Sequence, residues 1–183
     1  PIGKMSGALS SFSAADLGGF AIKAALERAG VKPEEVEHVI MGQVLMAGQG
    51  QVPSRQAAVK AGIPMSVPAV NINKVCLSGL NTIYLADQMI AAGEADIVIA
   101  GGMESMSNVP YYIPKGRFGY KYGNAELVDG LVKDGLFEAY YKFPMGNCAD
   151  NTAKEMNISR EEQDTYAIQS YTRSAEAWKS GAF

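Results

Sequence analysis

Cys76 is the residue in this sequence with the clearest capacity for covalent chemistry. It stands where an alternating apolar stretch, residues 67–75, gives way to small residues with helical spacing that begin at Ser78. A helix start presents free backbone N–H groups and partial positive charge, which stabilise a thiolate relative to a thiol. Cys76 is therefore a candidate nucleophile. Free cysteine is also among the most buried residue types, so simple packing is the alternative interpretation.

Few other residues offer comparable chemistry. The only histidine, His38, lies at the head of an early apolar stretch, and its sequence neighbours do not pair it with a nucleophile, so we do not expect it to be catalytic. The acidic pairs at 34–35 and 161–162 occupy first-turn positions, where the helix dipole accounts for them. The glycines at 48–50 and 101–102 lack the spacing of a nucleotide-binding loop.

The two cysteines, Cys76 and Cys148, form neither a disulfide framework nor a set of metal ligands. We therefore predict a reducing compartment and no metal site. The net charge of the 183 residues is -3, and the basic residues are scattered, which argues against nucleic acid or an acidic membrane surface as a partner. The apolar runs are shorter than the roughly 18 residues of a membrane helix, so we expect no membrane span.

Apolar periodicity and helix boundary signals predict alternating helices and strands, and hence an α/β fold. Two capping boxes, one at Ser13 and one at Ser159, mark the starts of helices that end at Gly30 and Gly181. The predicted helices cover residues 14–29, 54–61, 78–92, 151–156 and 160–180, and the predicted strands cover 36–45, 67–75 and 95–100.

Residues 107–147 are rich in tyrosine, proline and glycine and have weaker periodicity, which indicates an excursion from the core. Within this segment, residues 115–122 combine basic and aromatic side chains. The residues alone leave two interpretations open: an ordinary solvated loop, or a contact surface with another subunit.

Four segments together resemble the motifs of thiolases, in particular the biosynthetic acetyl-CoA acetyltransferases. They are NKVCLSGL at 73–80, AGGMESMS at 100–107, MGNCADNTA at 145–153 and SREEQD at 159–164. The resemblance covers essentially the whole chain. It implies an αβαβα layered fold built from two similar halves, of which this chain is the N-terminal half. Residues 1–106 would form the core domain without its first strand, residues 107–183 would begin the inserted loop domain, and the C-terminal half would lie outside the chain.

The same resemblance implies that Cys76 carries the acyl group. Its thiolate would attack acetyl-CoA, and a second acetyl-CoA would then condense with acetyl-Cys76 to give acetoacetyl-CoA and CoA, reversibly. Coenzyme A would be part of the substrate, with no separate cofactor. A degradative 3-ketoacyl-CoA thiolase or another condensing enzyme of the same fold is one alternative. A truncated, non-catalytic remnant is the other.

Substrate-pocket residues and the oligomeric state also follow from the resemblance. Leu136, Pro144 and Met145 would line the acyl and pantetheine pocket, and Pro144 stands where similar bacterial enzymes often carry a histidine. Residues 115–122 correspond to a tetramerisation loop, so a homotetramer is expected for the full-length parent.

Three further catalytic motifs of thiolases are not matched in this chain. The resemblance places all three in the C-terminal half: a C-x-G cysteine as the base, a Gly-His-Pro histidine that activates the nucleophile, and an asparagine-histidine pair at the oxyanion site. Cys148 corresponds to a non-catalytic position. We therefore expect the isolated chain to lack turnover. We expect a cytoplasmic location. The mitochondrion is the alternative, since a targeting peptide would precede residue 1 and would not be visible in this sequence.

Overall fold

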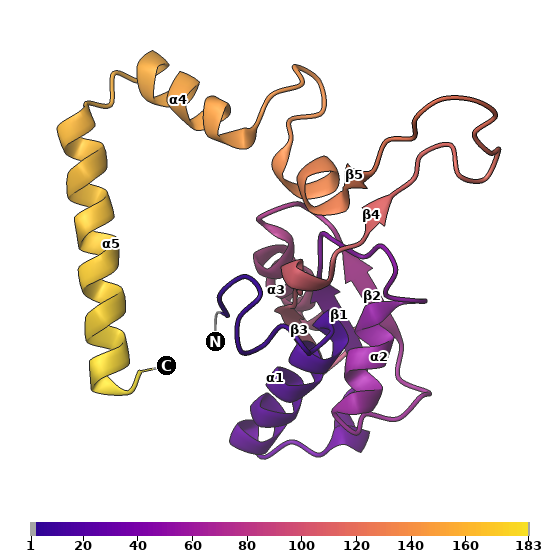
Figure 1. Ribbon diagram of the computed structural model, residues 1–183. Helices are drawn as coiled ribbons and strands as arrows, with labels where there is room; N and C mark the ends of the chain where they lie inside the picture. Colours follow the sequence, from indigo (N-terminus) through magenta and orange to yellow (C-terminus); the bar gives the residue numbers. More distant parts are fainter. Residues whose placement is uncertain (1–2, 183) are drawn as a thin grey trace. The chain divides into compact units, whose positions relative to one another are not determined.

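The computed structural model describes residues 3–182 and divides them into two compact units (Figure 1). We call residues 3–135 the N-terminal unit and residues 136–182 the C-terminal unit. The predicted domain boundary at 106/107 stays a prediction. The N-terminal unit contains α1 (Ala14–Ala29), η1 (Pro33–Glu35), β1 (His38–Gly42), α2 (Pro53–Lys60), β2 (Ala69–Ile72), α3 (Ser78–Ala91), β3 (Val98–Gly102), η2 (Met106–Asn108), β4 (Tyr111–Tyr112) and β5 (Val128–Asp129).

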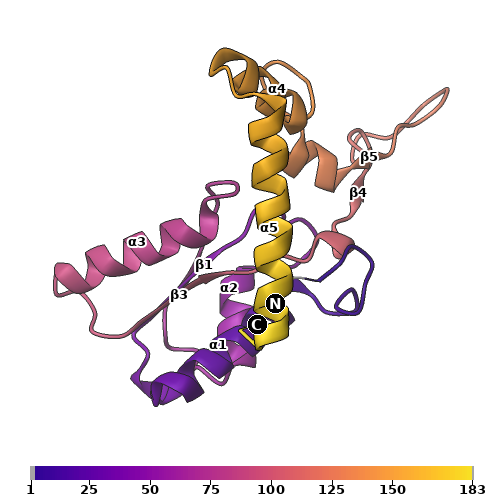
Figure 2. The same ribbon diagram turned by 90° about the vertical axis from the view of Figure 1, so that its left-hand side faces the viewer.

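The central sheet has three parallel strands in the order β2-β1-β3, which confirms the predicted α/β class. The chain moves from β1 outward to β2 through α2 and then returns across β1 to β3 through α3. Because crossovers between parallel strands are right-handed, this reversal of direction places α2 and α3 on opposite faces of the sheet. Figure 2 shows this layering, with α3 on one face and α1 and α2 on the other.

Side chains of β1 alternate between the two faces of the sheet, and each face has its own packing partner. Val39 and Met41 are buried in a core shared with α1 and α2. Ile40 is also buried, and Gly42 faces the first turn of α3. The core on the α1 and α2 side consists of Ala14, Ala15, Ile22, Leu26, Val36, Val39, Met41, Ala57, Ala58, Ala61, Ile63, Val67 and Met103.

The side of α3 that does not pack on the sheet is a partly apolar surface. Leu80, Ile83, Tyr84 and Ile90 are all exposed on this helix, although the sequence pattern marks them as its apolar positions. In this structure α3 therefore buries only small side chains against the sheet, among them Ser78, Thr82 and Ala86.

The C-terminal unit is built differently. The turn η3 (Val132–Leu136) leads into it, and α4 (Met145–Glu155) and α5 (Arg160–Ser180) follow. None of its described residues is buried. Its long helix has a capping box at Ser159 and a left-handed Gly181 at its end, which confirms both predicted boundaries of α5.

Several predicted boundaries are wrong. The helix expected at 151–156 begins six residues earlier, at Met145, because Pro144 adopts the extended conformation that precedes a helix. The strand expected at 95–100 shifts to Val98–Gly102, since the Glu37 carboxylate accepts the backbone N–H groups of residues 96 and 97 before the ladder begins. The strands expected at 36–45 and 67–75 are shorter, at His38–Gly42 and Ala69–Ile72.

Within the part of the chain that the structure describes, every helix is too short or too polar to cross a membrane. The same residues contain no cluster of three or more His, Cys, Asp or Glu side chains that could hold a metal ion.

Candidate active site

Cys76 lies in the short connection between β2 and α3, two residues before the helix begins, and it is exposed. The connection leaves β2 at Ile72, so it belongs to the edge of the sheet where the parallel strands have their carboxyl ends. Ligands of open α/β sheets bind at this edge. The predicted strand-to-helix position of Cys76 is thus confirmed, and its side chain is not simply packed in the core.

Close backbone packing holds the start of α3 on the sheet. A Cβ atom on Gly42 would lie 2.5 Å from the backbone N of Gly79 and 2.5 Å from the carbonyl carbon of Ser78. A Cβ atom on Gly102, the register partner of Gly42 on β3, would lie 3.3 Å from the Cα of Gly79. Only glycine permits this close approach. The approach fixes the position of the start of α3, and with it Cys76, relative to the sheet.

The residue before Cys76 has an unusual backbone conformation. Val75 has φ +49°, in the left-handed region. This region is a genuine outlier for a β-branched residue and costs about 1–3 kcal/mol. The side-chain oxygen Oδ1 of Asn73 accepts the Val75 N–H at 3.0 Å, which stabilises the sharp turn into Cys76.

Ser78 holds the same turn from the helix side. Its Oγ accepts the Lys74 N–H at 2.9 Å and donates to the Val75 carbonyl at 2.6 Å. The Ser78 side chain is buried, whereas Cys76 itself is exposed. We call residues 73–78 the nucleophile turn.

A partly buried carboxylate connects the nucleophile turn to a second motif. Glu104, from the AGGMESMS segment, accepts the N–H groups of Val44 and Leu45 at 2.8 Å and 3.2 Å. The Val44 carbonyl in turn accepts the Asn73 side-chain amide at 3.4 Å. Burial raises the pKa of Glu104, and its hydrogen bonds to these backbone N–H groups oppose that rise. The two motifs therefore meet at the carboxyl edge of the sheet.

His38 lies at the other end of the same strand. It is the first residue of β1, and Gly42, which contacts the start of α3, is the last. Four residue steps along a strand span about 13 Å, which is too far for direct proton transfer to Cys76. Its buried Nδ1 has no hydrogen-bond partner among the described residues. The expectation that His38 is not the catalytic base is consistent with this placement.

The predicted pocket residues lie in the C-terminal unit, whereas Cys76 lies in the N-terminal unit. An antiparallel bridge pairs Phe137 with Pro144, so Leu136 and Met145 flank the same bridge on opposite segments. Both side chains are about half exposed, at 44% and 46%. The structure thus brings the three predicted pocket residues together. Cys148 follows in α4 as a free, partly buried thiol.

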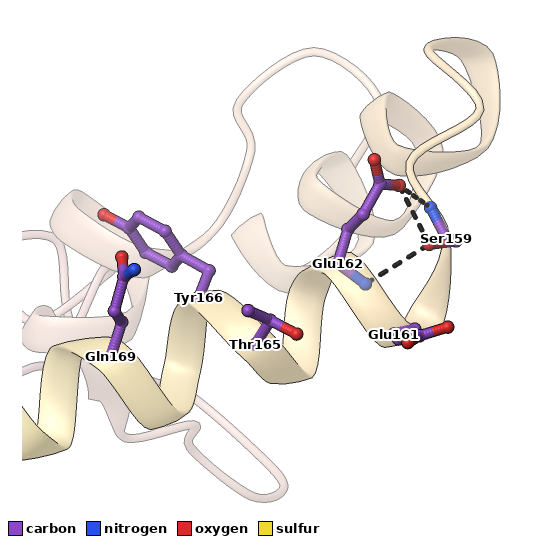
Figure 3. Close-up of a pocket in the computed structure, with 6 residues that line it drawn as sticks. All are labelled: Ser159, Glu161, Glu162, Thr165, Tyr166 and Gln169. Carbon is purple, nitrogen blue, oxygen red and sulfur yellow. Dashed lines mark hydrogen bonds between the residues drawn. The ribbon is translucent and has the colours of Figure 1, made fainter.

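A surface pocket of the C-terminal unit is formed by one face of α5 alone (Figure 3). Its carboxylate Glu162 points back to Ser159 and accepts both the backbone N–H, at 2.7 Å, and the hydroxyl, at 2.8 Å. The Ser159 backbone N–H, the larger cause, and its hydroxyl lower the pKa of Glu162. This acid caps the helix, as the sequence predicted.

Sequence reasoning identified Cys76 but missed the groups that hold its turn. Asn73 precedes Val75 by two residues, which is the spacing of a side-chain turn and was a usable signal. The left-handed backbone of Val75 and the role of Glu104 depend on contacts between distant segments, and local patterns do not contain them.

Comparison with known proteins gives one family. The model of the thiolase N-terminal domain matches residues 1–183. A mitochondrial acetyl-CoA acetyltransferase of Xenopus tropicalis is 58% identical over 181 residues, which are 99% of this chain and 43% of that protein. Its Bos taurus counterpart is 54% identical over 183 residues, 100% of this chain and 43% of that protein. A Mycolicibacterium smegmatis protein named "Probable acetyl-CoA acetyltransferase" is 55% identical over 183 residues, 100% of this chain and 47% of that protein. The chain thus spans less than half the length of these relatives.

Proposed function

Because the chain belongs to the thiolase family, whose N-terminal domain it matches over its whole length, we propose that it supplies the acyl-carrying nucleophile of an acetyl-CoA C-acetyltransferase. The observation that carries this proposal is the placement of Cys76, exposed on a constrained turn at the carboxyl edge of the sheet. The names of the relatives support acetyl-CoA and acetoacetyl-CoA as substrates.

In the first half-reaction the thiolate of Cys76 attacks the carbonyl carbon of acetyl-CoA. A new S–C bond forms, the carbonyl electrons move onto oxygen, and collapse of the tetrahedral intermediate expels the CoA thiolate. Exchange of one thioester for another leaves acetyl-Cys76 at a similar free energy. The barrier lies in the charge on the oxyanion, and one well-placed donor for such a charge is worth about 3 kcal/mol.

In the second half-reaction a base removes an α-proton from another acetyl-CoA. The resulting carbanion attacks the acetyl-Cys76 carbonyl, forms the new C–C bond and returns the sulfur electrons to Cys76. The products are acetoacetyl-CoA and the free thiolate. Glu104 does not suit the role of base, because its carboxylate is occupied by the Val44 and Leu45 N–H groups. The resemblance to thiolases places this base in the C-terminal half of the full-length protein.

Family membership supports the remaining assignments, which are part of the same proposal. Leu136, Pro144 and Met145 contribute to the acyl and pantetheine pocket. Coenzyme A enters as part of the substrate, without a separate cofactor. Residues 115–122, which are all exposed and lie between β4 and β5, form the contact of a homotetramer. The location is the cytoplasm or the mitochondrion, and the names of the vertebrate relatives favour the mitochondrion.

Thiolysis of acetoacetyl-CoA by CoA tests this function. We expect no turnover by the 183-residue chain alone, and turnover when the chain is joined to the C-terminal part of the Xenopus tropicalis relative. Cys76→Ala in the joined protein should abolish turnover, whereas Cys148→Ala should retain it. Turnover that survives Cys76→Ala, or depends equally on Cys148, would contradict the proposal.

A further inference from the structure

The peptide group between Val75 and Cys76 has a double role in the nucleophile turn. Its carbonyl belongs to Val75 and its N–H belongs to Cys76, and the two point in opposite directions because the peptide is planar and trans. Whatever fixes the Val75 carbonyl therefore also fixes the direction of the Cys76 N–H. This N–H is the donor nearest to the sulfur that attacks the thioester.

One buried hydroxyl fixes that carbonyl. The Ser78 Oγ–H donates to the Val75 carbonyl at 2.6 Å, and the same oxygen accepts the Lys74 N–H at 2.9 Å. The backbone N–H of Ser78 also donates to this carbonyl, at 3.0 Å. A carbonyl that accepts two hydrogen bonds makes the N–H of its own peptide group a stronger donor, since hydrogen bonds in a chain polarise one another.

The turn needs this support because its backbone is strained. Val75 stays in the left-handed region only while its surroundings hold it there. Asn73 holds the N–H of Val75, and Ser78 holds its carbonyl. Without the Ser78 hydroxyl, the Val75 carbonyl keeps only the bond from the Ser78 backbone N–H. The Val75–Cys76 peptide then rotates more easily toward an ordinary conformation, and the Cys76 N–H turns with it.

We propose that Ser78 is a positioning residue for acyl transfer: its hydroxyl orients the Val75–Cys76 peptide so that the Cys76 N–H stabilises the oxyanion of the tetrahedral intermediate. This role rests on the proposed function of Cys76 as the acetyl carrier. Ser78 does not touch the substrate and acts through the backbone of its neighbour.

A second buried hydroxyl on the same helix provides a matched control. Thr82 lies one turn further along α3, is fully buried, and donates to the carbonyls of Gly79 and Gly101 at 2.7 Å and 3.0 Å. Its hydroxyl links the helix to β3, and both of its acceptors lie outside the nucleophile turn. Thr82→Val therefore removes a comparable hydrogen bond without changing the peptide at Cys76.

Two reactions at the Cys76 sulfur distinguish a misoriented oxyanion donor from a general disturbance of the site. Acetylation by acetyl-CoA passes through an oxyanion, whereas alkylation by iodoacetamide displaces iodide at a saturated carbon and does not. Both rates are measured at Cys76 of the purified protein by peptide mass spectrometry. Alkylation of Cys148, in the other unit, serves as the internal reference.

We expect Ser78→Ala to slow acetylation of Cys76 about 10-fold to 100-fold, part of the effect of losing an oxyanion donor, and to change alkylation less than about 2-fold. Thr82→Val should keep the ratio of the two rates. Equal acetylation by Ser78→Ala and the natural sequence, or a parallel fall of both rates, would overturn the role of Ser78. If the natural sequence is alkylated but never acetylated, the proposed function fails as well.

Should Ser78→Ala fail to fold, Asn73→Ala tests the same turn from its exposed side. Removing the acceptor for the Val75 N–H should also slow acetylation more than alkylation. Unchanged acetylation in Asn73→Ala would then count against the proposal.

Discussion

The two units of this chain obtain their structure from different sources. In the N-terminal unit, β1 is buried between helices on both faces, and backbone contacts at Gly42 fix the first turn of α3. In the C-terminal unit none of the described residues is buried, and α5 depends on its capping box, its Gly181 terminus and an Arg160–Asp164 ion pair. Cys76, the proposed nucleophile, lies in the unit that is organised by tertiary packing.

This difference matters for chemistry, because a reactive group needs a fixed surrounding. Capping and helix propensity are sufficient to define where a helix begins and ends. They do not hold a strained residue such as Val75 in place, which requires the surrounding structure to over-determine its conformation. Similar changes made in the two units should therefore have different effects.

The largest difference is expected for aliphatic truncation. Ile22→Ala removes a buried side chain of α1 and should lower the free energy of unfolding of the N-terminal unit by about 3–4 kcal/mol. Ile168→Ala on α5, where the side chain is 67% exposed, should change stability by less than about 0.5 kcal/mol. Denaturant unfolding followed by far-UV circular dichroism measures the free energy of unfolding of both variants. Equal losses would mean that the C-terminal unit has a core that the exposures do not reveal.

Replacing a glycine by alanine should change stability in opposite directions in the two units. Gly42→Ala places a Cβ atom 2.5 Å from backbone atoms of α3, which cannot move cheaply, and should destabilise the N-terminal unit by about 2–3 kcal/mol. Gly146→Ala in α4 meets no atom within 4 Å and should stabilise its helix by about 0.5–1 kcal/mol. The measurement is the unfolding midpoint of each variant. A neutral Gly42→Ala would refute the close packing of α3 on the sheet.

Loss of a capping serine should separate packed from unpacked helices. Ser13→Ala and Ser159→Ala each remove a capping box, which costs about 1 kcal/mol. The packed α1 should stay helical, because its buried face holds it. The exposed α5 should fray, with lower helical content and faster amide hydrogen exchange in its first turn. If loss of the capping serine changed amide hydrogen exchange equally in α1 and α5, the distinction between a packed and an unpacked helix would be wrong.

Acid titration gives the smallest effect. The Lys60 ammonium, in a 2.6 Å ion pair, and Ser13 lower the pKa of Asp16 to about 2. A carboxyl with a lowered folded pKa stabilises the fold above its ordinary pKa of 3.8, and this contribution is lost as pH falls from about 4 to about 2. Lys60→Met should return the pKa of Asp16 toward 3.8 and leave Glu162 unchanged. Carboxyl NMR titration measures both, and an Asp16 that titrates near 3.8 in the natural sequence would contradict this ion pair.

The sequence was sufficient to predict the parts of the structure that local signals determine. The capping boxes at Ser13 and Ser159, the α/β alternation and the strand-to-helix position of Cys76 are all confirmed. The start of α4 was missed because Pro144 and Gly146 read locally as a loop.

Other features depend on residues far apart in the sequence. The approach of Gly42 to Ser78 and the hydrogen bonds of Glu104 to Val44 connect segments about 36 and 60 residues apart. No periodicity within one segment predicts such contacts. For the same reason, the sequence pattern treated Ser78 as an ordinary small residue at a helix start. Its hydroxyl in fact donates to the Val75 carbonyl, just before Cys76.

The most direct test of the central claim is to incubate the protein with acetyl-CoA, quench the reaction in acid and map the acetyl group by peptide mass spectrometry. We predict an acetyl group on Cys76 and none on Cys148, with loss of the adduct in Cys76→Ser. An adduct shared equally by both cysteines, or no adduct on a Cys76 that reacts readily with iodoacetamide, would contradict the assignment of Cys76 as the acetyl carrier.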